Sequence, residues 1–251
     1  MAKTIASQMG LDIVIVKGQD IYSKYIGESE KKLGQLFKEA AKKNAILFFD
    51  EIHELFGNDS KESSGAGEKT CVPTDFLKLM DNKPKGLIIM AATNEPWKVK
   101  ATVVRRFNMK YELKMPDTNA RGALLKHFIR EYGLLNFLKE DDIREYSEKL
   151  QDYSPNDIKN IIGEVHGISM DNIVEATYFL PWNLVDKNKA FIPCDSSDKG
   201  AIKTTYKQCP GMVRSLICRP YMNKALRECK KTEISEEHLE ELRKFSKKHM
   251  R

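Results

Sequence analysis

The sequence lacks a long apolar run, paired cysteines and a complete zinc-protease motif. No apolar run approaches the roughly 20 residues needed to cross a bilayer, and the first ten residues lack the apolar core of a signal peptide. The five cysteines are odd in number and form no C-x-x-C pair, which argues against a disulfide framework or a zinc site. His53-Glu54 begins like a metalloprotease motif, but Gly57 stands where the second histidine belongs. We therefore expect a cytoplasmic protein without a structural metal.

What is present is the composition of a globular protein. Hydrophobic residues make up 41% of the 251 residues and charged residues 31%, enough for one large domain or two smaller ones. The net charge of +6 is compatible with an acidic partner or a membrane surface. A solvated lysine-rich surface is the simpler interpretation, and we expect no nucleic-acid partner.

The first half of the chain alternates short apolar runs with segments of helical period. Strands are predicted at residues 13–16, 45–49, 87–92 and 109–113, helices at residues 29–43 and 74–80, and a polar loop at residues 58–70. This alternation predicts a parallel sheet covered on both faces. Such sheets bind ligands at the carboxyl ends of their strands. Asp50, Glu51, Thr93 and Asn94 follow predicted strands, so the pattern indicates a site there.

After Pro116 the sequence becomes mostly helical. Helices are predicted at about residues 118–130, 141–150, 154–176 and 235–249, and a small β hairpin within residues 179–206. The helix at Ser154 has a strong start, with a serine cap, Pro155 at the first helical position and Asp157 in the first turn. This part of the chain is predicted to be a second, helical domain.

Four apolar residues followed by Asp50-Glu51 form a Walker B pattern. A carboxylate at Asp50 can hold Mg²⁺, usually through water, and Glu51 can act as the general base that polarises an attacking water. Taken alone the pattern is weak evidence, because a solvent-exposed strand end without a function has the same sequence pattern.

Two further features follow in the order that a nucleotide hydrolase needs. Asn94 ends the next strand, where an amide can orient water against a γ-phosphate. Arg105 and Arg106 can stabilise the charge of a transferring phosphoryl group, including one on a neighbouring subunit. The plainer interpretations are an asparagine in a turn and a basic surface pair. The order of all these features is what makes the signal specific.

At this point the chain resembles the meiotic clade of AAA ATPases, which includes katanin, spastin, fidgetin and the vacuolar protein sorting protein four enzymes. The resemblance rests on four motifs and covers nearly the whole chain: Ser23-Lys24-Tyr25-Ile26-Gly27-Glu28-Ser29-Glu30, Phe49-Asp50-Glu51-Ile52, Ala92-Thr93-Asn94-Glu95-Pro96-Trp97 and Arg105-Arg106-Phe107. Within the clade, Ala176-Thr177-Tyr178-Phe179 and the segment from Pro193 to Ile202 are similar to the vacuolar sorting members.

The resemblance implies a fold and a domain layout. Residues 1–115 would be an α/β AAA+ large domain with a parallel sheet, residues 116–234 a helical lid with a small β insertion at about residues 177–207, and residues 235–251 a C-terminal helix packed on the large domain. An activating cofactor protein binds the β insertion in that family.

The resemblance also assigns roles to residues. Lys24, Tyr25, Ile26 and Gly27 would form the loop that grips substrate in the pore of a homo-hexamer, although an aromatic packed near a turn is the plainer interpretation of Tyr25. ATP and Mg²⁺ would be the cofactors. Asp50 and Asn94 would contact them, with Ser154 and Asp157 near the adenine.

The chain departs from the family most at its start. The phosphate-binding motif G-x-x-x-x-G-K-[ST] and its strand would lie just before Met1, and we expect the natural polypeptide to begin earlier. Residues 64–70 imitate the motif, but Glu68 interrupts its Gly-Lys step. In addition, His53 replaces the usual aspartate, and Pro155-Asn156 replaces a Gly-Ala pair near the adenine.

Three functions remain open. The first is a hexameric motor that pulls subunits from ESCRT-III polymers while recruited to endosomal membranes by peripheral contact only. The second is a microtubule-severing ATPase, since the core motifs are shared. The third is a scaffold unable to hydrolyse nucleotide, which the absent phosphate loop favours and the retained Glu51 disfavours.

Overall fold

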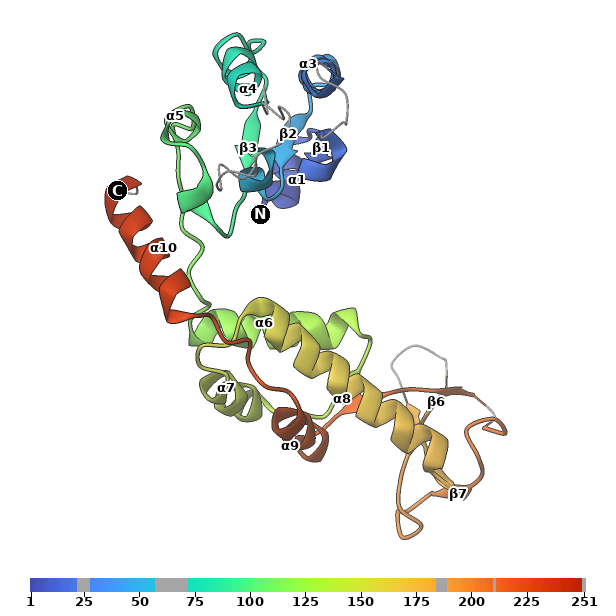
Figure 1. The fold of residues 1–251 in the computed structure, drawn as a ribbon. Coiled ribbons are helices and arrows are strands. Elements are labelled where there is room, and N and C mark those ends of the chain that lie inside the picture. The colour runs from blue at the N-terminus through green and yellow to red at the C-terminus, as the bar shows by residue number, and fades with distance from the viewer. Residues whose placement is uncertain (22–27, 57–71, 184–188, 210, 250–251) are drawn as a thin grey trace, which may run out of the picture. The chain divides into compact units, whose positions relative to one another are not determined.

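A computed structural model describes residues 1–21, 28–56, 72–183, 189–209 and 211–249 (Figure 1). The chain divides into two compact units, one formed by Met1–Glu112 with Ser235–Arg251 and the other by Leu113–Ile234. Within the described residues, no helix combines the length and the apolar character needed to cross a membrane.

The first unit is built around a parallel sheet. Its elements are α1 (Ala2–Met9), β1 (Ile13–Val16), α2 (Gly18–Ile21), α3 (Glu28–Lys42), β2 (Ile46–Phe49), the 3₁₀ helix η1 (Ile52–Phe56), α4 (Val72–Asp81), β3 (Ile89–Ala91), the 3₁₀ helix η2 (Pro96–Lys98), α5 (Ala101–Val104) and α10 (Glu236–His249). The strand order is β1-β2-β3 and both pairings are parallel. The predicted α/β fold with a parallel sheet is therefore confirmed.

One face of this sheet carries the core of the unit. Side chains alternate across a strand, so the register that pairs Val16 with Phe49 and Phe49 with Ala91 puts all three on the same face. These residues pack against buried side chains of α3, α4 and α5. On the opposite face Ile15 is 42% exposed. The prediction of a sheet covered on both faces therefore holds fully for one face only.

Three aromatic rings fill the centre of this core. Phe76 of α4 stands edge-on to Phe49 of β2 and to Phe37 of α3, with ring centroids 5.3 and 6.3 Å apart. All three rings are buried. Edge-to-face pairs are favourable beyond the area they bury, so these rings hold α3 and α4 against β2, the strand that Asp50 follows.

The strand predicted at residues 109–113 is wrong. None of these residues belongs to a strand or a helix. Met109, Tyr111 and Leu113 alternate as a strand would, but they are 72%, 66% and 76% exposed. The sequence carries the period-2 pattern, but a strand also needs a neighbour to bond its backbone, and the described residues supply none here.

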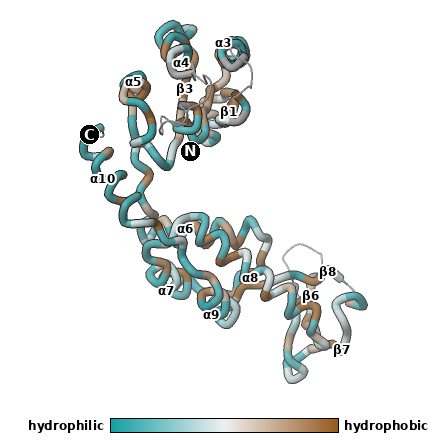
Figure 2. Tube along the Cα trace, viewed as in Figure 1, coloured by the Kyte–Doolittle hydropathy of each residue, from teal (hydrophilic) through white to brown (hydrophobic). Residues whose placement is uncertain are grey.

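The C-terminal helix α10 belongs to the first unit. The His238 ring stands edge-on to Trp97 of η2 with centroids 4.8 Å apart, Phe245 packs against the core, and Ser246 Oγ lies 2.8 Å from a carboxylate oxygen of Glu112. Figure 2 shows α10 as a mostly hydrophilic helix, and none of its residues is fully buried. A few apolar contacts therefore attach it.

The second unit is mostly helical. Its elements are α6 (Thr118–Glu131), β4 (Leu135–Asn136), α7 (Glu140–Lys149), α8 (Pro155–Glu175), β5 (Tyr178–Asn183), β6 (Lys189–Pro193), β7 (Ile202–Lys203), β8 (Met212–Val213), β9 (Leu216–Ile217) and α9 (Arg219–Glu228). The helices surround an apolar core, and β5 to β8 form a small sheet of order β7-β5-β6-β8. Neither α9 nor the parallel pair of β4 and β9 was predicted from the sequence.

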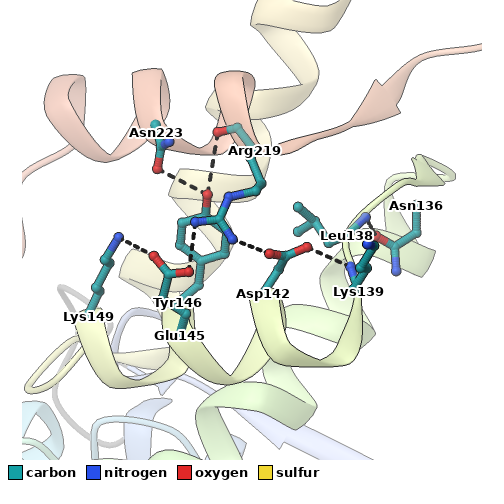
Figure 3. A network of polar contacts seen from close by, with 9 residues as sticks. All are labelled: Asn136, Leu138, Lys139, Asp142, Glu145, Tyr146, Lys149, Arg219 and Asn223. Carbon is teal, nitrogen blue, oxygen red and sulfur yellow. Dashed lines mark hydrogen bonds and ion pairs between the residues drawn. The ribbon is translucent and has the colours of Figure 1, made fainter.

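Polar contacts join α7 to α9 across this unit (Figure 3). The Arg219 guanidinium bonds Asp142 and lies 2.8 Å from Glu145, while the buried Tyr146 hydroxyl donates to Asn223 at 3.0 Å. Backbone hydrogen bonding from Lys139, opposed by desolvation and assisted by Arg219, lowers the pKa of Asp142. The carboxylate is thereby kept charged as a partner for the arginine.

Candidate functional site

The backbone holds Glu51 in an unusual conformation at the end of β2. Asp50 N donates to Val16 O and Ile52 N donates to Ala92 O, both at 2.9 Å, so the chain is anchored on each side of Glu51. Glu51 has a φ of +50°, which is uncommon for a residue with a side chain. Such conformations persist where the surroundings determine them and are frequent at functional sites.

Glu51 and Asn94 meet because β2 and β3 are parallel neighbours whose carboxyl ends lie at one edge. Asn94 N lies 3.3 Å from Glu51 Oε2 and donates to it. The contact comes from the backbone of Asn94, and Asn94 itself is exposed. The structure thus brings together Asp50, Glu51 and Asn94, as the sequence predicted from their positions after strands.

The oxygen groups at this edge suit magnesium. Asp50 is half-buried, and its carboxylate forms no hydrogen bond or ion pair with the side chains that the structure describes. Magnesium in phosphoryl-transfer sites takes one or two carboxylates, with water and phosphate oxygens completing its shell. Within the described ranges no three His, Cys, Asp or Glu side chains group into a metal site by themselves. One carboxylate therefore fits a magnesium ion shared with a nucleotide.

His53 lies beside Glu51 and Asn94, although it was not among the site residues predicted from the sequence. Its Nδ1 is 2.8 Å from Thr93 Oγ1 and 3.4 Å from Glu51 Oε2, and its Nε2 is 3.0 Å from Glu95 Oε2. Only 12% of the side chain is exposed. The sequence shows that Thr93 and Glu95 flank Asn94, which could have suggested a polar cluster at this edge. Only the parallel register of β2 and β3 shows that His53 reaches both residues.

Glu95 is charged for reasons visible in the structure. Its other oxygen, Oε1, is 2.6 Å from Lys98 Nζ, and its backbone N donates to Thr93 Oγ1 at 3.0 Å. The Lys98 hydrogen bond lowers the pKa of Glu95 against the effect of burial, and His53 and His238 lower it further. A carboxylate therefore faces the Nε2 side of the His53 ring.

The two predicted arginines differ in their surroundings. Arg106 donates two hydrogen bonds to Asp81 at the end of α4, from Nε to Oδ1 and from Nη2 to Oδ2, each 3.0 Å long. This pairing lowers the pKa of Asp81. Arg105 is exposed and makes no hydrogen bond or ion pair through its side chain to the described residues. Neither arginine bonds Asp50, Glu51 or Asn94, so of the two Arg105 is the freer to reach another molecule.

Ser154 and Asp157, predicted near the adenine, use their polar atoms to cap α8. Ser154 Oγ accepts from Asp157 N at 3.1 Å, and Asp157 Oδ2 accepts from Ser154 N at 2.9 Å. Asp157 Oδ1 accepts from the hydroxyl of Thr232 at 2.6 Å and from its N–H at 3.3 Å. Both residues belong to the second unit, and the side chain of Asp157 is occupied by its own chain.

The predicted pore residues Lys24, Tyr25, Ile26 and Gly27 lie outside the described residues. The predicted loop at residues 58–70, with the imitation of a phosphate loop inside it, lies outside them as well.

Comparison with known proteins gives a consistent class. Residues 1–115 match the model of the ATPase family associated with various cellular activities (AAA). The chain is 31% identical to vacuolar protein sorting-associated protein 4B of Pongo abelii over 98% of its own length, and 29% identical to cell division protein C of Sulfolobus acidocaldarius over 66%. These matches span 57% and 46% of the two relatives, so the chain corresponds to about half of each.

A solved structure shares the fold. The crystal structure of the FIGL-1 AAA domain in complex with ADP superposes with a TM-score of 0.67 at 18% identity, covering 99% of this chain and 73% of that one. Together with the parallel sheet and the acidic strand end, these matches identify residues 1–115 as an AAA ATPase domain. Over 98% of its length the chain is similar to vacuolar protein sorting-associated proteins 4A and 4B, at 28–31% identity.

Proposed function

We propose that the chain is the motor part of an ATP-hydrolysing hexamer that disassembles ESCRT-III polymers in endosomal sorting. The observation that carries the proposal is the fixed position of Glu51: a strained backbone at a strand end, beside Asp50 and hydrogen-bonded to Asn94 N–H. Similarity to the vacuolar protein sorting-associated protein 4 group over 98% of the chain supports the choice of substrate.

Each residue at the strand ends has a chemical role in this proposal. Glu51 accepts the proton of the attacking water, and the Asn94 amide orients that water. Asp50 would hold Mg²⁺ through water, and the ion, when bound, neutralises phosphate charge. Arg105 stabilises the charge that develops on the transferring group of a neighbouring subunit. This last role suits an exposed arginine whose side chain bonds none of the residues that the structure describes, and Arg105 is such a residue.

The remaining partners follow from the same proposal. Six identical subunits form the ring, an activating cofactor protein binds the small sheet of β5 to β8, and the assembly is cytoplasmic until it contacts endosomal membranes. Lys24 to Gly27 form the pore loop, and Ser154 and Asp157 lie near the adenine. Asp157 acts there through the start of α8, since its own carboxylate is already bonded.

A scaffold without hydrolysis is the second candidate. It is favoured by one observation, namely that the 251 residues contain no G-x-x-x-x-G-K-[ST] motif. Because the chain spans about half of its relatives, both candidates are tested on the protein at the length found in its source cells. The intact mass of that protein is measured first, against the 28.8 kDa of this chain.

The decisive variant is Glu51→Gln, which keeps the shape of the side chain and removes the base. We expect ATP binding, followed with a fluorescent analogue, to persist while turnover falls by about 10²–10⁴-fold, the usual contribution of a general base. Glu39→Gln, at an exposed position of α3, is the matched control and should hydrolyse ATP normally. Turnover that survives Glu51→Gln would show that Glu51 is not the base. A wild-type protein that binds no ATP would favour the scaffold.

A further inference from the structure

His53 is a titratable group beside the proposed general base, only 12% of its side chain is exposed, and the proposed function gives it no role. It lies on η1, which follows Asp50 and Glu51 after the end of β2 at Phe49. Its ring reaches Glu51 on its own segment and both Thr93 and Glu95 on the segment after β3. The ring thus connects the segments that follow β2 and β3, and His53 and Thr93 are 40 residues apart in the sequence.

The contacts distinguish the two oxygens of Glu51. Oε2 accepts from Asn94 N at 3.3 Å and lies 3.4 Å from His53 Nδ1, which is itself 2.8 Å from Thr93 Oγ1. Oε1 has no hydrogen bond or ion pair to the residues that the structure describes. This asymmetry suits a general base, because one oxygen can stay bound to the protein while the other accepts the proton of water.

The groups around the His53 ring determine which of its nitrogens must carry a proton for a hydrogen bond to form. A carboxylate oxygen can only accept, so each contact is a hydrogen bond only when the facing ring nitrogen carries a proton. The Thr93 hydroxyl can accept or donate. Lys98 bonds Glu95 at 2.6 Å and Glu95 faces Nε2, which fixes the ring from its far side. Lys98, Glu95, His53 and Glu51 therefore form a chain of contacts in which the imidazole ring lies between two carboxylates.

We propose that His53 is a positioning residue for Glu51: a proton on Nδ1 holds Oε2 beside the Asn94 N–H and turns Oε1 toward water. Glu95 and Lys98 orient the ring that does this. The inference rests on the proposed ATPase function, because it assumes that Glu51 is the base. No bond is made or broken by His53 itself.

The first test needs no nucleotide. The chain has five histidines, so ¹⁵N-labelled histidine gives a short list of ring signals, and a His53→Asn spectrum assigns the one of interest. We expect Nδ1 of His53 to resonate as a protonated nitrogen at the pH of the ATPase assay and to move in the Glu51→Gln variant. An unprotonated Nδ1 that accepts from Thr93, or a signal indifferent to Glu51→Gln, overturns the proposal.

The second test uses two substitutions that each restore half of the ring. The amide of His53→Asn reaches roughly the place of Nδ1, and that of His53→Gln roughly the place of Nε2. We expect His53→Ala and His53→Gln to lower kcat about tenfold with KM unchanged, the scale expected when a catalytic group is misplaced. His53→Asn should recover most of kcat. His127→Ala, at an exposed histidine of α6, is the control.

The outcomes separate this inference from the function on which it rests. If Glu51→Gln abolishes turnover but His53→Ala does not lower kcat, only the positioning role fails. If Glu51→Gln retains turnover, the assignment of the base fails first. A purely structural His53 would lower thermal stability and raise KM in all three variants alike, and Asn would not rescue kcat. With a positioning role, adding His53→Ala to Glu51→Gln should cost nothing further in kcat.

Discussion

Asp157 offers the sharpest test of what stabilises the second unit. Its carboxylate connects the start of α8 to Thr232, which is distant in the sequence. It accepts from Ser154 N at 2.9 Å and from Thr232 Oγ1 at 2.6 Å, and the residue is only 4% exposed. The change to test is Asp157→Ala. It leaves the serine cap of the helix in place but removes every acceptor that the carboxylate supplies.

The magnitude follows from these contacts. A hydrogen bond to a charged group contributes about 1.5–3 kcal/mol, and a buried donor left without a partner costs about 1–3 kcal/mol. Contributions of contacting groups are not additive, so we expect a loss of about 2–4 kcal/mol for Asp157→Ala. For a domain of this size about 3 kcal/mol lowers the unfolding midpoint by roughly 10 °C.

The assay is thermal unfolding of the second unit, followed together with hydrogen exchange at the Thr232 amide. Asp171→Ala is the matched control, since Asp171 lies exposed on the same helix and its loss should change stability by less than about 0.5 kcal/mol. Equal midpoints for the two variants would refute the reasoning. That result would favour the alternative that Asp157 contacts a bound nucleotide.

The free energy of unfolding at acidic pH gives an independent check of the role of Asp157. Burial raises the pKa of Asp157, but hydrogen bonds from Thr232 and Ser154 outweigh it, and the pKa is lowered overall. A lowered carboxyl pKa contributes stability above the unfolded value of about 3.9, and that stability is lost as pH falls through the folded value. The gap between wild type and Asp157→Ala should therefore be constant near neutral pH and shrink below about pH 4.

Two further predictions concern the first unit. Phe76→Ala should destabilise it by about 3–5 kcal/mol, because it empties the centre of the aromatic core; a loss below about 1 kcal/mol in urea unfolding would contradict the packing described. Arg105→Ala in the assembled protein should lower ATP turnover by about 10³-fold without changing the unfolding midpoint, because Arg105 is exposed and its side chain bonds none of the residues that the structure describes. Arg106→Ala should cost less turnover, since Arg106 is held by Asp81; the reverse order would show that Arg106 is the one that reaches the neighbouring subunit.

Local sequence signals predicted most of the fold because each element is marked by its own residues. The four β-branched residues of β1 gave its bounds, and the Ser-Pro-Asn-Asp start placed the beginning of α8. Helix ends elsewhere differ from prediction by one or two residues, which is the usual uncertainty where helices fray. The short strands β4 and β9 were missed because two residues are too few to show a period.

The failures have a different cause, since they depend on partners distant in the sequence. Residues 109–113 have the composition and alternation of a strand, and the described chain offers no backbone to pair with them. The Asp157 capping box was visible in the sequence, but the bond to Thr232, 75 residues away, was not. Strand propensity indicates which conformation a segment favours locally, whereas backbone pairing with another strand depends on the whole fold.

The site shows the same division. Asp50, Glu51 and Asn94 were found because strand ends of a parallel sheet converge, which the chain order alone implies. His53 was noticed only as a departure from the family and as half of a failed zinc motif. Its contacts to Thr93 and Glu95 require the register that pairs Phe49 with Ala91, and that register brings the two strand ends level.

The replacement of an aspartate by His53 has a consequence for the choice between motor and scaffold. An aspartate there would put a third carboxylate near Glu51 and Glu95, and like charges so close disfavour one another. The histidine instead places its two ring nitrogens 3.4 and 3.0 Å from carboxylate oxygens of Glu51 and Glu95, and Glu95 also contacts Lys98. A ring nitrogen that carries a proton can donate to a carboxylate, whereas an ionised aspartate can only accept. The absence of a third carboxylate at position 53 supports the proposed motor over the scaffold, because only hydrolysis uses Glu51 as a base.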